Sequence, residues 1–325
     1  MKVGVIGGGA WGTALAEVAA QGGETLLWAR EPEVVQSISE RRENSLFLPG
    51  VPLSDLIRPT ADLADLSACD LWLVVTPAQH MRAVLQAAPA CPGALLLCSK
   101  GIEEKSGKLL HTVARESCPE AAIMVLSGPT FAHEVAAGLP TALTLAAEDE
   151  AEAEAVRGRL ARAAFRIYLS DDVAGAEVGG AVKNVLAIAC GVVEGRGLGQ
   201  NARAALIARG FAEMTRFGLA RGARPETLGG LSGLGDLVLT CSSTSSRNFS
   251  LGKGLGQGRP AAELMADRRT VAEGAFTAPV LRRLAEEEGI DMPIVAAVDD
   301  LLDGRTNVDG VLERLLSRPL RPERA

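Results

Sequence analysis

The feature that most constrains this chain is a glycine-rich motif next to its N-terminus. Gly7-Gly8-Gly9-Ala10-Trp11-Gly12 has G-x-G-x-x-G spacing, between the apolar run Lys2–Ile6 and the helical pattern Gly12–Gln21. Strand, turn and helix in this order make the pattern specific. Gly7 permits a tight turn, Gly9 lets a pyrophosphate approach the backbone, and Gly12 lets the helix pack on the strand. Because the helix also offers free N–H groups to an anion, the motif predicts a dinucleotide-binding turn.

The first half of the chain repeats this alternation of strand and helix. Most expected strands are continuously apolar, which is typical of strands that helices cover on both faces. The pattern therefore predicts a doubly wound, Rossmann-like α/β sheet in a dinucleotide-binding domain of residues 1–170. The expected strands are Lys2–Ile6, Thr25–Ala29, Leu71–Thr76, Ala94–Ser99, Ile123–Ser127, Thr141–Ala146 and Arg166–Leu169.

Helical patterns dominate residues 171–325, which predicts a mainly α-helical substrate and catalytic domain. Ser170-Asp171-Asp172 is the expected N-cap of its first helix. The Gly/Ser-rich stretch Gly229–Gly258 is expected to form a long loop of the functional or mobile kind. The expected helices are Val173–Val193, Ala202–Leu219, Ala261–Ala266, Ala278–Glu288 and Ile294–Leu302.

Charge and hydropathy exclude several classes of protein. The net charge is -7 and no stretch is strongly basic, which argues against a nucleic-acid partner. The chain starts with an expected strand instead of a signal peptide. Its longest apolar window, Ala174–Val193, is broken by Glu177, Lys183 and Asn184, which argues against membrane insertion. We therefore expect a soluble cytoplasmic protein, in which a phosphate ligand would be held by local groups.

The cysteines and histidines do not indicate a metal site. The six cysteines form no C-x-x-C pair, and several lie in apolar runs, so we expect free, buried thiols in a reducing compartment. The three histidines lack metal-ligand spacing, so no metal is expected.

Two lysines are candidate catalytic residues. Lys100 ends the apolar run 94–99, and in an open α/β sheet the carboxyl ends of the strands line the ligand crevice. Lys183 lies in a helical run of Gly, Ala, Val and Leu, where a charge is costly to bury unless it is paired. Burial also lowers the pKa of a lysine toward a useful catalytic range. The alternatives are a solvated lysine at position 100 and, at 183, one that reaches the surface along its apolar stem.

Polar groups in two further segments could bind a substrate. Arg247 offers a planar fork suited to a phosphate, and Asp236 could accept a bond from a substrate hydroxyl or orient a lysine. The alternative is a flexible loop with a solvated arginine. The Gly128-Pro129 turn and Thr130 follow an expected strand and should reach the same crevice.

The end of the second expected strand bears on the choice of cofactor. An acid at this place favours NAD, whereas an arginine accommodates the 2′-phosphate of NADP. Arg30 stands there, followed by Glu31. We therefore expect NADPH to be used and NADH to be accepted as well, the alternative being that Arg30 is only a solvated surface charge.

Six motifs, in order and at compatible spacing, together resemble the bacterial NAD(P)-dependent glycerol-3-phosphate dehydrogenase family along almost the whole chain. The motifs are Gly7–Leu15, Ser99–Gly101, Ser127–Ala132, Gly179–Asn184, Gly233–Leu237 and Ser246–Asn248. The resemblance implies reversible hydride transfer between NAD(P)H and dihydroxyacetone phosphate. The product, sn-glycerol 3-phosphate, would serve glycerophospholipid synthesis, and a homodimer is a family-level expectation.

The resemblance also implies roles for individual residues. Lys183 matches the proton donor and acceptor, and Lys100 matches a residue that contacts both cofactor and substrate. Ala10 departs from the serine that is common at its position, so one hydrogen bond to a phosphate would be lost. The implied substrate contacts are Lys100, Gly128, Thr130, Lys183, Asp236, Ser246, Arg247 and Asn248. The cofactor contacts are Gly7, Gly9, Ala10, Trp11, Gly12, Arg30, Lys100, Ala132, Arg247, Val271 and Glu273.

Two other functions compete with this interpretation. A related Rossmann-plus-helical enzyme could act on a 2-hydroxy acid or on ketopantoate, substrates that carry a carboxylate and no phosphate. A nucleotide-sensing protein without turnover would have no need of a proton donor, so the two lysines argue against it.

Overall fold

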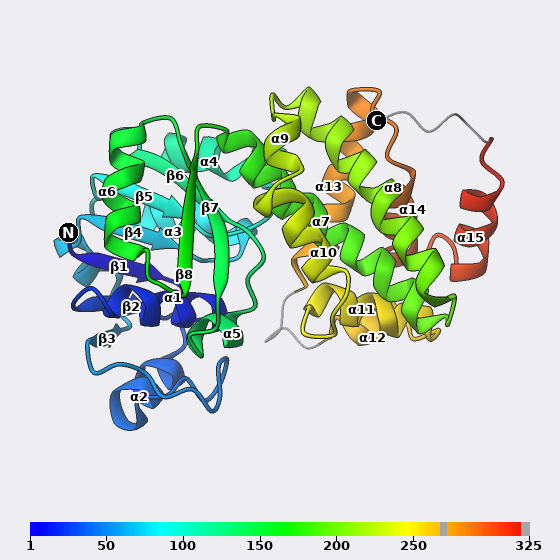
Figure 1. Ribbon diagram of the computed structural model, residues 1–325. Helices are drawn as coiled ribbons and strands as arrows, with labels where there is room; N and C mark the ends of the chain where they lie inside the picture. The colour runs from blue at the N-terminus through cyan, green and yellow to red at the C-terminus, as the bar shows by residue number, and fades with distance from the viewer. Residues whose placement is uncertain (267–271, 320–325) are drawn as a thin grey trace. The chain divides into compact units, whose positions relative to one another are not determined.

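The computed structural model describes residues 1–266 and 272–319 of the chain, in two compact units (Figure 1). The first unit consists of Met1–Lys100 and Lys108–Glu177, and the second of Gly101–Gly107 and Val178–Ala325. Nothing in the sequence indicated that the short segment Gly101–Gly107 belongs with the second unit.

The first unit is built on an eight-stranded sheet in the order β3-β2-β1-β4-β5-β6-β7-β8 (Figure 1). Neighbouring strands are parallel except β6 and β7, which are antiparallel. The reversal of strand order beside β1 confirms the doubly wound fold, with its ligand edge at the carboxyl ends of the parallel strands. The strands are β1 (Val3–Ile6), β2 (Thr25–Trp28), β3 (Ile57–Thr60), β4 (Leu71–Val74), β5 (Ala94–Leu97), β6 (Ala122–Ser127), β7 (Thr141–Ala147) and β8 (Phe165–Ser170).

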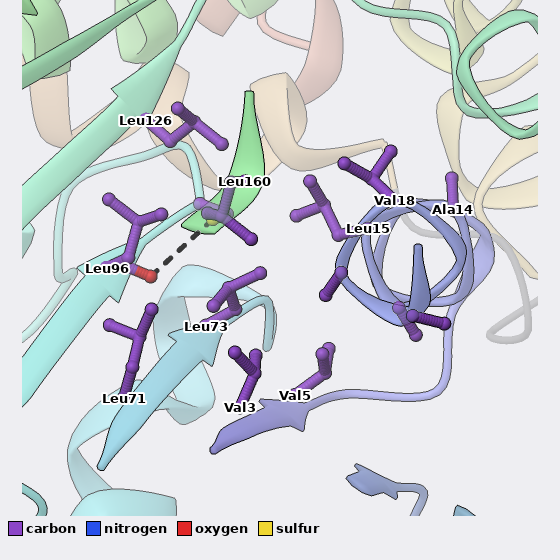
Figure 2. Close-up of a cluster of buried hydrophobic side chains, with 14 of the residues drawn as sticks. Val3, Val5, Ala14, Leu15, Val18, Leu71, Leu73, Leu96, Leu126 and Leu160 are labelled. Carbon is purple, nitrogen blue, oxygen red and sulfur yellow. Dashed lines mark hydrogen bonds between the residues drawn. The ribbon is translucent and has the colours of Figure 1, made fainter. Parts of the chain in front are cut away.

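Hydrophobic cores lie on both faces of this sheet. In β4, Leu71 and Leu73 belong to one cluster, whereas Trp72 and Val74 belong to the other. Figure 2 shows the first cluster, in which strand residues such as Val5 and Leu73 lie near Leu15 of α1. Burial on both faces explains why the strands read as continuous apolar runs. The helices of this unit are α1 (Ala10–Ala20), α2 (Pro32–Arg41), α3 (Met81–Ala87), α4 (Leu110–Ser117), α5 (Ala132–Ala136) and α6 (Glu150–Leu160), with short 3-10 turns η1 (Leu63–Ala68) and η2 (Ala78–His80).

One strand was not expected from the sequence. The segment Ile57-Arg58-Pro59-Thr60 has no apolar run, yet it forms β3 and pairs in parallel with β2. Proline cannot donate to a strand ladder and is tolerated at a sheet edge. Because β3 is the last strand on its side, the edge position explains both the proline and the weak sequence signal.

Helices dominate the chain from Val173 onward, as expected. The N-cap prediction is confirmed at Asp172, whose Oδ1 accepts the Gly175 N–H at 2.8 Å. The first of these helices, α7, is long and apolar enough to cross a membrane by length and composition, but its apolar window is fully buried inside the structure, as in a core helix. The helices are α7 (Val173–Gly195), α8 (Gly199–Ala220), α9 (Pro225–Leu228), α10 (Asp236–Thr240), α11 (Arg247–Gly256), α12 (Ala261–Leu264), α13 (Glu273–Glu287), α14 (Pro293–Leu302) and α15 (Val308–Leu316).

The expectation of a long loop over Gly229–Gly258 was wrong. This stretch forms a π-helical turn, η3 (Leu231–Gly235), followed by α10 and α11. Its glycines serve close packing. A Cβ on Gly252 would lie 1.9 Å from the Ile188 carbonyl oxygen, and one on Gly191 would lie 2.1 Å from the Phe249 carbonyl oxygen. Glycine therefore lets the backbones of α11 and α7 touch, which a composition-based reading mistakes for flexibility.

The expectation that all six cysteines are free thiols was also wrong. Cys91 and Cys118 form a disulfide, with their Cα atoms 5.9 Å apart, a separation that a disulfide spans without backbone movement. The pairing joins the segment before β5 to the end of α4, and no sequence pattern announces it. The other four cysteines, Cys69, Cys98, Cys190 and Cys241, are free and buried as expected.

Candidate functional site

The glycine-rich turn begins directly after β1, at the carboxyl edge of the sheet. Gly7 has a φ of +124°, a conformation that favours glycine. A Cβ on Gly12 would lie only 1.8 Å from the Gly7 carbonyl oxygen. Both glycines are therefore required for α1 to start so close to β1.

The start of α1 fits the phosphates of a dinucleotide. Gly9 is the N-cap of α1, and no side chain caps this helix end. A Cβ added to Gly9 would meet no atom within 4 Å. The uncapped N–H groups of Ala10 and Trp11 thus border open space, where an anion is favoured by the helix dipole.

Asn44 holds this turn in place, and sequence reasoning missed it. Its fully buried side chain donates from Nδ2 to the Gly8 carbonyl oxygen and to Thr13 Oγ1, both at 2.8 Å. Its Oδ1 accepts the Phe47 N–H at 3.1 Å. Asn44 lies between α2 and β3, 36 residues from Gly8, and a lone asparagine in a loop gives no signal of such a contact.

Lys100, Gly128 and Thr130 come together at the same edge of the sheet. Lys100 Nζ donates to the Gly128 carbonyl oxygen at 3.3 Å, and Thr130 Oγ1 donates to the same oxygen at 3.2 Å. Lys100 is half-buried, which is not the solvated strand-end lysine of the alternative interpretation. Ala132 follows as the first residue of α5.

Two buried hydroxyls flank this group and were not singled out from the sequence. Thr76 follows β4 and Ser127 ends β6, on either side of β5. Within the described residues 1–266 and 272–319, Thr76 Oγ1, Ser127 Oγ and Trp11 Nε1 are buried without a hydrogen-bond partner. Unpaired buried polar atoms are costly and rare, so a polar ligand at this edge would satisfy them.

Arg30 and Glu31 lie beyond β2, next to the glycine-rich turn. A Cβ on Gly8 would lie 2.4 Å from the Cβ of Ala29, so the residue before Arg30 is packed against the turn. Arg30 Nε and Nη2 both donate to Glu31 Oε1, at 3.1 and 2.9 Å. The arginine side chain is largely exposed, but its charge is paired.

In the second unit, Lys183 is buried within an ion pair. Only 6% of the residue is exposed. Its Nζ donates to Asp236 Oδ1 at 2.6 Å and to Thr240 Oγ1 at 3.0 Å. Asp236 and Thr240, one turn apart on α10, are buried as well. The alternative of a lysine that reaches the surface is therefore wrong, and the buried charge has the partner that its burial requires.

Asn248 links three helices beside this ion pair. Its Nδ2 donates to Asn184 Oδ1 at 3.0 Å, and its Oδ1 accepts the Gly274 N–H at 2.9 Å. Asn184 follows Lys183 on α7, and Gly274 follows Glu273 on α13. The side-chain amide of Asn248 is thus engaged within the protein, a contact set that its place in the sequence did not indicate.

Ser246 and Arg247 stand at the start of α11. Ser246 is its N-cap, and its Oγ accepts the Phe249 N–H at 3.2 Å. Arg247 is the first helical residue and is exposed, so its guanidinium can meet an anion from solvent. Val271, the remaining cofactor candidate, lies outside the described residues.

Cys241 follows Thr240 in the chain and interacts electrostatically with both Lys183 and Asp236. A hydrogen bond with Cys190 and burial raise the pKa of Cys241 well above its usual value. The thiol next to Thr240 therefore stays neutral near pH 7.

Two family models match the chain. The NAD-dependent glycerol-3-phosphate dehydrogenase N-terminus matches residues 2–153, and the C-terminus of the same family matches residues 172–313. The chain is also 64% identical over 323 residues to a glycerol-3-phosphate dehydrogenase (NAD(P)+) from Erythrobacter litoralis, covering 99% of this chain and 98% of that protein. A protein of the same name from Novosphingobium aromaticivorans is 64% identical over 324 residues, with the same coverage.

Solved structures agree with the sequence matches. The crystal structure of glycerol-3-phosphate dehydrogenase from Coxiella burnetii aligns with a TM-score of 0.93 and 36% identity, covering 98% of this chain and 99% of that one. A ketopantoate reductase from Ralstonia eutropha aligns with a TM-score of 0.59 and 17% identity, covering 94% of this chain and 98% of that one, which shows a shared fold alone. The ketopantoate-type alternative is therefore not favoured.

Proposed function

Because the chain belongs to the NAD-dependent glycerol-3-phosphate dehydrogenase family, we propose that it catalyses reversible hydride transfer between NAD(P)H and dihydroxyacetone phosphate, giving sn-glycerol 3-phosphate. The observation that carries the proposal is the buried Lys183–Asp236 ion pair. A buried lysine with a carboxylate partner is a positioned proton carrier, and reduction of a ketone needs one.

The first unit would bind the cofactor. The open space at Gly9 and the N-terminus of α1 suit the pyrophosphate, held without the hydroxyl that a serine at Ala10 would add. Arg30 would meet the adenosine ribose, and Trp11 would contribute its unpaired indole N–H. When bound, the nicotinamide supplies the hydride. Gly7, Gly12 and Ala132 complete the proposed contacts in this unit, and the resemblance also implies cofactor contacts at Arg247, Val271 and Glu273 of the second unit.

Lys183 would act as the general acid. As C2 of the ketone receives a hydride, negative charge develops on its oxygen, and a proton must reach that atom. Asp236 and Thr240 accept hydrogen bonds from Lys183 Nζ, so they fix the ammonium in place. Lys100 would add positive charge near the same oxygen. In the oxidation of glycerol 3-phosphate, Lys183 accepts the proton as the general base.

The substrate phosphate would bind at the start of α11. Arg247 presents a guanidinium fork to solvent beside the N-terminus of this ten-residue helix, and both favour a dianion. In a chain of net charge -7, such a local site is needed to bind a phosphate. Holding the phosphate orients C2 for hydride transfer. Gly128, Thr130, Ser246 and Asn248 complete the proposed substrate contacts.

Replacement of Lys183 by alanine tests the assignment. Lys183→Ala should lower kcat by about 100-fold or more, because a general acid contributes roughly 10²- to 10⁴-fold, while NADPH still binds. Lys105→Ala removes an exposed lysine and serves as the matched control, with kcat unchanged. Near-normal turnover of Lys183→Ala would remove Lys183 from the mechanism.

We further propose a cytoplasmic homodimer whose product serves glycerophospholipid synthesis. Four free, buried cysteines, Cys69, Cys98, Cys190 and Cys241, suit a reducing compartment, whereas the Cys91–Cys118 disulfide weighs against one. Light scattering on the purified chain tests the dimer, and a mass of one chain would contradict it.

A further inference from the structure

Arg30 and Glu31 form an ion pair where the adenosine ribose of a dinucleotide would lie. Both Arg30 nitrogens donate to one oxygen of Glu31, although the arginine side chain is 74% exposed and could point into solvent. Ala29 packs against Gly8 of the glycine-rich turn, which ties the pair to the phosphate-binding loop.

The side chain of Glu31 is not used by its own helix. It is the N-cap of α2, yet its carboxylate caps no N–H of that helix, and the next residue, Pro32, has no N–H to offer. The carboxylate instead bonds to Arg30. The main chain of Glu31 thus starts α2, by accepting the Val34 N–H, while its carboxylate is paired with the charge of Arg30.

The two members of the pair suit two different cofactors. A carboxylate at the end of the second strand accepts a hydrogen bond from the free 2′-hydroxyl of NADH, whereas an arginine accommodates the 2′-phosphate of NADPH. The phosphate carries a charge of about -1.5 to -2 at pH 7, so Glu31 repels it and also competes with it for Arg30.

We propose that Glu31 is a specificity-determining residue that restrains the preference for NADPH and keeps NADH in use. The inference rests on the proposed function, because it presumes that the first unit binds both cofactors. Arg30 attracts the 2′-phosphate, Glu31 opposes that attraction, and the balance of the two sets the ratio of the dissociation constants.

Glu31→Gln tests this role. Glutamine keeps an oxygen that can accept from the 2′-hydroxyl, but it removes the negative charge. The Kd for NADPH should fall about two- to fivefold, the range expected for one exposed charge pair, while the Kd for NADH should change less than about twofold. High salt should shrink the difference, because the charge of Arg30 is exposed and that of Glu31 is partly exposed.

Two further variants make the experiment specific. Glu33→Gln removes the same charge from the first turn of α2, and we expect the Kd ratio to stay unchanged because the ion pair of Arg30 is made with Glu31 and not with Glu33. Arg30→Gln should raise the Kd for NADPH and leave that for NADH nearly constant.

Calorimetric titration of the whole protein with NADPH and NADH separates the outcomes without relying on turnover. An unchanged Kd ratio in Glu31→Gln, or an equal shift in Glu33→Gln, would overturn the role of Glu31. If the unmodified protein bound neither cofactor, the proposed function itself would fail.

Discussion

At the scale of single residues, the site depends on polar side chains that are buried with their partners. Lys183 has Asp236 and Thr240, and Asn44 has two acceptors and one donor. A buried polar group is costly when a partner is removed, because the remaining group cannot return to water. Each of these contacts can therefore be tested by a change that removes one partner and little volume.

Asp236→Asn removes the carboxylate that accepts a hydrogen bond from Lys183 Nζ. We expect the free energy of unfolding of the second unit to fall by about 3 kcal/mol and kcat to fall at least about tenfold, since a buried ion pair loses one partner and the position of Lys183 is no longer fixed by it. Denaturant unfolding and steady-state rates measure the two effects. Asp309→Asn, which breaks the more exposed pair with Arg196, is the control and should change both by little. Equal effects in the two variants would show that the buried pair of Lys183 matters no more for stability or turnover than an exposed ion pair.

Asn44→Asp replaces the donor that faces the Gly8 carbonyl by a second acceptor. The change should weaken NADPH binding about tenfold, because the turn loses its anchor and gains a repulsion, and it should cost about 1–3 kcal/mol of stability. Calorimetric titration with NADPH gives the binding constant. An affinity that stayed normal despite the loss of stability would mean that Asn44 supports the fold without shaping the cofactor loop.

At this scale the sequence indicated that Lys183 needs a partner and that Asp236 could orient a lysine, but it did not indicate the roles of Thr240 and Asn44. Lys183 stands out because a charge in an apolar helix needs an explanation. Thr240 and Asn44 do not stand out, because a hydroxyl or an amide is ordinary until the fold places another group beside it. The roles proposed for Ser246, Arg247 and Asn248 came from the resemblance to a family, since a Ser-rich stretch alone fits a solvated loop equally well.

At the scale of helices and strands, close backbone contact between α7 and α11 shapes the second unit. A Cβ on Gly252 would meet the Ile188 carbonyl carbon and oxygen, and one on Gly256 would lie 2.4 Å from the Val192 carbonyl oxygen. Since α7 carries Lys183 and α11 carries Arg247, this contact sets how far apart the proposed acid and the proposed phosphate site lie.

Gly252→Ala should push the two helices apart. The added Cβ would lie 1.9 Å from a backbone oxygen that has no freedom to rotate away. We therefore expect the free energy of unfolding to fall by about 3 kcal/mol or more, the upper end of the range for an overpacked core. Gly158→Ala, in α6 with no atom within 4 Å of the new Cβ, is the matched control and should stabilise the protein by roughly 0.5–1 kcal/mol. Thermal or denaturant unfolding measures the stability of both variants. A Gly252→Ala variant as stable as the unmodified protein would contradict the close contact between α7 and α11.

Glu213 of α8 caps the start of α14, where its carboxylate accepts hydrogen bonds from the Ile294 and Val295 N–H groups. Burial raises the pKa of Glu213 to about 7, against those N–H groups and the nearby Arg216, with Asp291 adding to the rise. The folded protein thus holds a proton that the unfolded chain releases near pH 4.5. The free energy of unfolding that the protonated Glu213 contributes is fully present below about pH 4.5, and it is lost as the pH rises through about 7.

We expect Glu213 to lower the free energy of unfolding by at most about 1.4 kcal/mol for each pH unit in this range. Glu213→Gln should remove this slope between about pH 5 and about pH 7, because glutamine does not titrate. Denaturant unfolding of the unmodified protein and the variant across that range provides the comparison. Parallel pH profiles would show that Glu213 titrates alike in the folded and unfolded states.

The strands that helices bury on both faces were predicted well, whereas edges and close contacts were not. Continuous apolar runs marked every strand from β4 to β7. The edge strand β3 contains a proline and little apolar surface, so its burial pattern gives no such signal. The helices within Gly229–Gly258 escaped prediction because glycine marks both a flexible loop and a tight helix contact, and only the partner helix distinguishes them.

At the scale of the whole molecule, the proposed activity divides between the two units. The family models match them in turn, with residues 2–153 in the first unit apart from Gly101–Gly107, and 172–313 mostly in the second. The glycine-rich turn lies in the first unit and the Lys183–Asp236 pair in the second. The alternation of strands and helices followed by a run of helices correctly predicted the fold class, an α/β sheet followed by a mainly helical part.

The central claim is that this chain reduces dihydroxyacetone phosphate with NAD(P)H. The most direct test follows the loss of NADPH absorbance when the purified protein meets dihydroxyacetone phosphate, with NADH and with ketopantoate run beside it. We predict rapid oxidation with dihydroxyacetone phosphate, slower or no oxidation with ketopantoate, and measurable rates with both cofactors. Folded protein that binds NADPH but leaves it unoxidised by dihydroxyacetone phosphate would contradict the claim.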